Sequence, residues 1–187
     1  MASEIDICNL ALAHLGDTAT IASLSPPEGS AQAEHCARFY PVARDSLLEM
    51  HSWGFATKRV QLALLTSGWP EWTYAYAQPA DALNVIAILP PESTDDYSTG
   101  VPDSAGGSYV PQPFSCEIND SGAPVIYTDQ ADAVLRYSAT VTDPTRFSPL
   151  FVMALSWHLA SMLAGPIIKG DAGAAEAKRC AGMMQAY

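Results

Sequence analysis

The hydrophobic periodicity of the chain changes twice, and these changes restrict the folds that the chain can adopt. Apolar residues recur every three or four positions in residues 3–15 and again in residues 31–53, which predicts two amphipathic helices. Residues 55–141 show a period of two, as strands do. The helical period returns after Pro149. This order predicts an α+β protein, with a helical bundle formed by the N- and C-terminal helices and a central, mostly antiparallel β-region.

Capping residues and prolines set the expected limits of the first two helices. Ser3 precedes the first helix as its N-cap, and Gly16 supplies its end. Pro41 removes one backbone hydrogen bond from the second helix and predicts a kink in it. An alternative is a break at Tyr40, because the residue before a proline disfavours the helical conformation.

The last two helices have similar local signals. Ser148 followed by Pro149 predicts a helix start, because a proline at the first helical position loses no hydrogen bond. We expect this helix to end near Leu163, before Gly165-Pro166. No apolar run is then expected to reach the ~20 residues that span a bilayer. Residues 171–184 are expected to form the final helix.

The expected domain organisation follows from these elements. Residues 1–54 and 147–187 are assigned to the helical bundle, and residues 55–146 to the β-region, with a long loop at 90–113. A turn at Ser67-Gly68 joins the first two strands. The strands themselves are expected over residues 55–65, 72–76, 83–89, 114–118, 125–128 and 134–141.

The net charge argues against tight binding to nucleic acid. Nine basic and twenty acidic residues give a net charge of −11, whereas a DNA-binding surface needs lysine and arginine to displace counterions from phosphates. No lysine or arginine lies between Arg59 and Arg136, while ten acidic residues do. This acidic block is either an ordinary solvated surface or a surface that repels phosphates.

The sequence contains no recognisable catalytic or cofactor motif, and we expect no enzyme activity, cofactor or metal. Its four histidines lack the spacing of metal ligands on one helix face, and no nucleophile elbow, phosphate-binding loop or dinucleotide fingerprint occurs. His14 and His158 are expected to be hydrogen-bonded structural residues. The four cysteines lie far apart in the chain, and we expect them to be reduced thiols, because we expect the protein to be cytosolic at synthesis.

Aromatic residues are the candidates for a protein interface. The stretch from Trp53 to Tyr76 holds more aromatic and apolar residues than one small sheet needs. The long loop lacks regular apolar positions, so its own aromatic residues are expected to contact a partner. The interface candidates are Trp53, Phe55, Trp69, Trp72, Tyr97, Tyr109 and Val110.

An ordered set of short segments resembles one family over nearly the whole chain. These segments are CNLALAHLG at residues 8–16, YPVARDSLL at 40–48, WGFA at 53–56, PADAL at 79–83, IYTD at 126–129, LRY at 135–137, FSPLF at 147–151, AL at 154–155 and LA at 159–160. Together they resemble the head-to-tail adaptor of tailed bacteriophages, the tail tubular protein A family of short-tailed phages.

The resemblance implies a structural protein of the virion, at the head–tail junction. It implies a ring of twelve copies that docks under the portal protein and carries the tail nozzle or tube protein below it. DNA would pass through the lumen without sequence-specific binding, and no membrane is involved. We expect neighbouring copies to make head-to-tail contacts between the bundle of one copy and the β-region of the next.

Two other classes of protein stay open on the sequence. One is a head-completion or tail-terminator protein of a long-tailed phage, which would sit at a different height in the virion. The other is a small tail-associated enzyme, which would require a catalytic group of residues that the sequence does not display.

Overall fold

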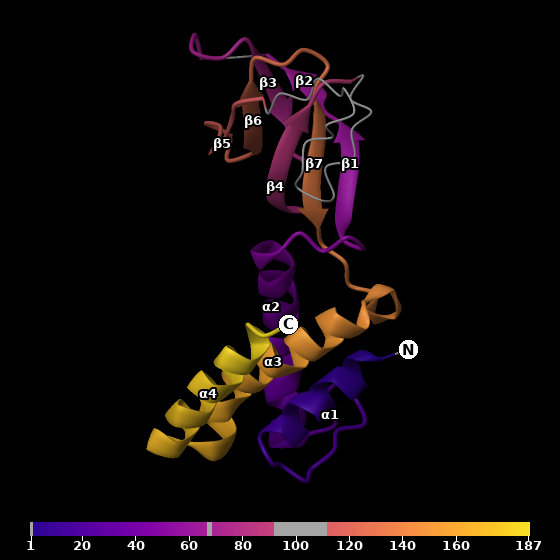
Figure 1. Cartoon of the computed structure of the whole chain (residues 1–187), viewed down its shortest axis with the longest axis vertical. Coiled ribbons are helices and arrows are strands. Elements are labelled where there is room, and N and C mark those ends of the chain that lie inside the picture. The colour runs from indigo at the N-terminus through magenta and orange to yellow at the C-terminus, as the bar shows by residue number, and fades with distance from the viewer. Residues whose placement is uncertain (1, 67–68, 92–111) are drawn as a thin grey trace. The chain divides into compact units, whose positions relative to one another are not determined.

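The computed structural model describes residues 2–66, 69–91 and 112–187. The chain divides into a helical unit, Met1–His51 with Val141–Tyr187, and a β unit, Ser52–Thr140. Figure 1 shows helices from both ends of the chain in the first unit and antiparallel strands in the second. The fold is therefore α+β, as the sequence predicts. The boundaries between the units, after His51 and after Thr140, lie a few residues before the expected boundaries at 54 and 146.

The third helix is the centre of the helical unit. It contacts each of the other three helices, and its Phe151, Leu155, Leu159 and Leu163 are fully buried at steps of four residues. Their burial supplies the apolar core that isolated helices lack. The α-helices described in this unit are α1 (Glu4–His14), α2 (Ala31–Met50), α3 (Pro149–Ile168) and α4 (Gly170–Met184), and a short 3-10 helix, Pro144–Arg146, precedes α3.

Helix α1 has a complete cap at each end. The amide of Asp6 donates to Ser3 Oγ at 3.1 Å, and Ser3 N donates back to the Asp6 carboxylate at 2.9 Å, which is a capping box. At the other end Gly16 has a φ of 75°, and its amide donates to the Ala13 carbonyl at 3.0 Å. The following amide, of Asp17, donates to the Leu12 carbonyl at 3.1 Å, completing a Schellman motif.

Helix α2 is continuous through Pro41, so the alternative break at Tyr40 is wrong. The proline is exposed, whereas Tyr40 and Ala43 on either side are buried. Packing of these neighbours holds the helix together across the one backbone hydrogen bond that proline cannot donate.

Helix α3 continues beyond its expected end and stops at Ile168, with Pro166 inside it. The chain reverses at Lys169 and Gly170, which have φ values of 65° and 59°, and not at Gly165. By length and composition α3 is then the one helix in the described ranges that could cross a membrane. Half of its most apolar window is buried, and a single helix of this kind is weak evidence for a membrane span, because core helices of soluble proteins pass the same test.

The β unit contains two antiparallel sheets. One has the order β1-β7-β4 and the other the order β2-β3-β6-β5. Strands β5 and β6 form a hairpin around the turn at Asn119–Gly122. The bounds are β1 (Thr57–Gln61), β2 (Ala63–Leu65), β3 (Tyr74–Ala77), β4 (Ala82–Leu89), β5 (Phe114–Ile118), β6 (Pro124–Thr128) and β7 (Val134–Ala139).

The single strand expected over residues 55–65 is in fact two strands, which belong to different sheets. Leu62 separates them: its side chain is buried, and its amide donates to the Ala133 carbonyl at 2.9 Å. The backbone therefore crosses from one sheet to the other at this residue. The predicted turn at residues 67–68 and most of the predicted loop at 90–113 lie outside the described residues.

Side chains from both sheets form the core of the β unit. It includes Tyr76 of β3, Ile126 of β6 and Leu135 of β7, and also Leu62, which lies between β1 and β2. A second, smaller cluster of Ala75, Val125 and Tyr127 comes from alternate positions of β3 and β6. Because alternate residues of a strand face opposite sides, these two strands are apolar on both faces.

Candidate protein–protein interface

Two of the predicted interface residues lie next to each other at the start of the β unit. The rings of Trp53 and Phe55 have centroids 6.2 Å apart, and both side chains are half-buried. The Trp53 carbonyl accepts the amides of Ala56 and Thr57 at 2.9 Å, so a tight turn fixes this aromatic pair. The pair is therefore a rigid element of the surface, as an interface residue should be.

The other two tryptophans differ in exposure. Trp69 is 55% exposed, whereas Trp72 packs against the small cluster that includes Ala75 and Tyr127. Trp72 thus contributes to the subunit's own packing, and Trp69 keeps surface available for a partner. The remaining candidates, Tyr97, Tyr109 and Val110, lie outside the described residues.

Sequence reasoning missed the apolar residues on the strand edges. A single alternating strand over residues 55–65 would place Leu62 and Leu64 on the same face, but Leu62 is 7% exposed and Leu64 is 63% exposed. Ile118, at the end of β5, is 74% exposed. Strands β2 and β5 are the two outer strands of their sheet. A local sequence pattern does not show whether a strand is an outer one, because that depends on its pairing with distant segments.

A charged network ties the outer strands of the first sheet to its centre. Lys58 Nζ donates to the Asp81 carboxylate at 2.6 Å, and the hydroxyl of Tyr137 donates to the same carboxylate at 2.9 Å. The hydrogen bond from Lys58 lowers the pKa of Asp81, while burial and Asp81 raise the pKa of Tyr137 to about 12. The tyrosine is consequently a neutral hydrogen-bond donor near pH 7, and the network acts as a structural tie.

Two histidine–serine hydrogen bonds connect α3 to its neighbours. His14 Nε2 lies 3.0 Å from Ser156 Oγ, and His158 Nε2 lies 2.9 Å from Ser46 Oγ. Each serine donates its own proton to a backbone carbonyl, Met153 for Ser156 and Ala43 for Ser46. Each histidine must therefore be the donor, through Nε2–H. Both are structural histidines, as the sequence predicts.

Aromatic stacking reinforces the first of these bonds. The His14 ring stacks on Trp157 with centroids 3.5 Å apart, and the Arg179 guanidinium lies 5.2 Å from the Trp157 ring centroid. Arg179 also pairs with Glu176 and donates to the His14 carbonyl at 3.1 Å. This arrangement joins α1, α3 and α4 on one side of the helical unit.

The helical unit is expected to lose stability as the pH falls below about 6.5, the ordinary histidine pKa. Burial lowers the pKa of His158, and burial and Arg179 lower that of His14. The buried Nδ1 of His158 has no hydrogen-bond partner among the described residues, so a proton there would be unpaired. The unfolded chain then binds more protons than the folded one, which destabilises the fold in acid.

Urea unfolding at a series of pH values measures this effect. In His158→Gln the glutamine side chain keeps an N–H donor for Ser46, but it does not take up a proton in this pH range. The free energy of unfolding of this variant should therefore vary less between pH 7 and pH 5 than that of the wild type. The same change at the exposed His51 is the control. An equal pH dependence in wild type and His158→Gln would contradict the assignment.

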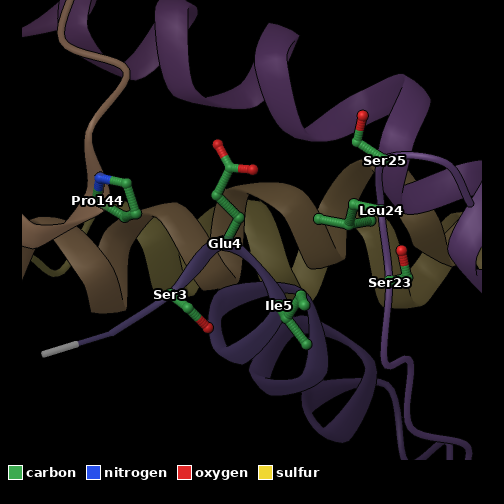
Figure 2. Close-up of a pocket in the computed structure, with 7 residues that line it drawn as sticks. All are labelled: Ser3, Glu4, Ile5, Ser23, Leu24, Ser25 and Pro144. Carbon is green, nitrogen blue, oxygen red and sulfur yellow. The ribbon is translucent and has the colours of Figure 1, made fainter.

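The helical unit contains a pocket of about 400 Å³. Figure 2 shows the residues that line it. Glu4 at the start of α1 and Leu24 from the following loop extend into the same space. Its hydroxyls serve the local structure: Ser3 belongs to the capping box, and Ser23 Oγ donates to the Pro26 carbonyl at 2.7 Å. The pocket lining is Ser3, Glu4, Ile5, Ser23, Leu24, Ser25 and Pro144.

All four cysteines are free, but tertiary structure brings two of them together. Cys8 of α1 and Cys36 of α2 are fully buried, and a hydrogen bond between them, with burial, raises the pKa of the Cys8 thiol. Cys180 is also buried, whereas Cys116 on β5 is exposed. The described part of the chain contains no group of three or more side chains suited to hold a metal ion.

Comparison with known proteins returns no matching family model and no matching curated protein.

Proposed function

We propose that this chain is a structural virion protein, the head-to-tail adaptor between the portal and the tail nozzle or tube of a tailed bacteriophage. The ordered set of segments from residues 8–16 to residues 159–160 carries this proposal, because it extends through both units of the chain. In this role the protein lines the DNA exit channel and binds three partners: other copies of itself, the portal protein and a tail protein.

The distribution of exposed apolar side chains supports an assembling protein. A subunit of a closed ring needs two different surfaces, because each copy contacts one neighbour with each of them. Large exposed apolar residues occur on both units, so each unit has apolar side chains available for a contact. They include Val42, Met50 and Leu150 on the helical unit and Leu64, Leu65, Trp69 and Ile118 on the β unit.

The charge supports a channel through which DNA moves. With a net charge of −11 and only Lys58, Arg59 and Arg136 as basic side chains in the β unit, the protein has few groups to hold phosphates. A lumen lined by such a protein repels the DNA backbone and does not retain it during ejection.

Electron microscopy of the purified protein tests the proposal. We expect closed rings, with native mass spectrometry giving twelve copies, either alone or after the addition of portal rings. Antibody labelling of virions should mark the head–tail junction. Single copies in the reconstructed connector, an open helix, or a label elsewhere on the particle would contradict the proposal. A label at the far end of a long neck would instead favour a tail-terminator protein.

A further inference from the structure

The sheet with the order β2-β3-β6-β5 ends in two outer strands that carry exposed apolar residues. Leu64 and Leu65 lie on β2, and Ile118 lies on β5. Neither strand is paired on its outer side with another strand of the described residues. The unpaired amides and carbonyls of an outer strand form a template for a further strand.

The outer strand β2 is short, at three residues, but its side chains include none of those that usually prevent such pairing. Soluble proteins protect sheet edges with lysine, proline or bulges. Strand β2 is Ala63–Leu65, with neither a charged residue nor a proline, and all three residues are exposed. Its register with β3 is regular, from Ala63 opposite Ala77 to Leu65 opposite Ala75. An edge of this kind is either an aggregation site or an interface.

Strand direction shows which strand would complete this edge. The sheet has four strands and every neighbouring pair is antiparallel, so β2 and β5 run in opposite directions. When β5 of one copy is placed beside β2 of the next copy, the new pair is antiparallel too. The contact would therefore continue the sheet with the pairing that it already uses.

The side-chain faces agree with this arrangement. Leu64 lies opposite Tyr76, and Cys116 lies opposite Ile126, two residues of the main core of the β unit. Residues directly opposite each other share a face, so Leu64 and Cys116 belong to the same face of the sheet, as does Ile118, two positions along β5. In the continued sheet Leu64 would therefore have Cys116 or Ile118 as its cross-strand neighbour.

We propose that the β5 edge of one copy pairs with the β2 edge of the next copy and holds neighbouring subunits together. The contact uses two different surfaces, so it repeats around a ring and does not stop at a dimer. This inference rests on the proposed ring. It adds a contact between β units to the expected contact between the bundle of one copy and the β-region of the next.

Oxidative cross-linking tests the contact through the native Cys116. Leu64→Cys places a second exposed thiol on β2, while the other three cysteines are buried. Mild oxidation with copper–phenanthroline should convert this variant into a ladder of disulfide-linked dimers, trimers and larger species. A second variant tests the other register, in which Leu64 lies opposite Ile118. It combines Leu64→Cys and Ile118→Cys with Cys116→Ser. Maleimide labelling establishes that each introduced thiol is reactive.

The controls separate the possible arrangements. Two proteins should form no ladder, because each has a single exposed thiol. They are the wild type and the double variant Leu64→Cys/Cys116→Ser. Dimers of Leu64→Cys with Cys116→Ser would show β2 pairing with β2 and would overturn the proposal. Rings without a ladder in either register would overturn this contact while leaving the adaptor function standing. A ladder on open fibres would support the contact and contradict the ring.

Discussion

Replacing Leu159 with alanine is expected to lower the free energy of unfolding of the helical unit by about 2–5 kcal/mol. Leu159 is fully buried in α3, the helix that contacts α1, α2 and α4. The change removes buried methyl groups and leaves a cavity that neighbouring side chains fill only in part. Urea denaturation followed by circular dichroism at a helix-sensitive wavelength measures the loss.

Leu150→Ala on the same helix is the matched control. Leu150 is 58% exposed, so its truncation should change the free energy of unfolding by no more than about 0.5 kcal/mol. Equal losses at the two positions would contradict the central place of α3 in the helical core. A control variant that assembles poorly but keeps its stability would place Leu150 in a subunit contact.

Gly173→Ala is expected to destabilise the same unit by about 1–3 kcal/mol, although alanine favours helices over glycine by about 1 kcal/mol. A Cβ at this position would lie 2.9 Å from the Ala164 carbonyl oxygen and 3.5 Å from Gly165 Cα. Both atoms belong to the backbone of α3, so the clash is relieved only when α3 and α4 move apart. The midpoint and slope of urea unfolding check this loss.

Gly182→Ala on α4 is the control for this change. A Cβ there meets no atom within 4 Å, so only the helix preference of alanine acts and the variant should be more stable by about 0.5–1 kcal/mol. Opposite signs at the two glycines would establish the close approach of α3 and α4. Stabilisation at both would contradict it.

Local chemistry made much of the helical unit predictable. Ser3 and Ser148 lie at the expected helix starts, because an N-cap depends on the next three residues only. The predicted end of α3 was wrong, because it also rested on local residues alone. The Gly165-Pro166 pair disfavours a helix, but burial of Leu163 and Ala164 and the contact with α4 keep the chain helical past it.

The candidate interface was only partly predictable. Trp69 was chosen for its residue type and is indeed exposed, but Trp72 packs against its own unit. The single strand expected over residues 55–65 would place Leu64 on the same face as Leu62, because alternation assumes that one strand continues through Leu62. The chain passes from one sheet to the other at that residue, and the pattern of apolar positions does not show such a change.

The sequence by itself determined the kinds of elements, most of their limits, the α+β class and the acidic charge, because each depends on residues within a few positions or on composition. Tertiary structure alone decided which strands are outermost, where Leu64 and Ile118 become exposed, and that Cys8 meets Cys36. Those outcomes depend on pairing and packing between segments far apart in the chain. Their energies are gained only when the whole unit folds, so no local window of sequence contains them.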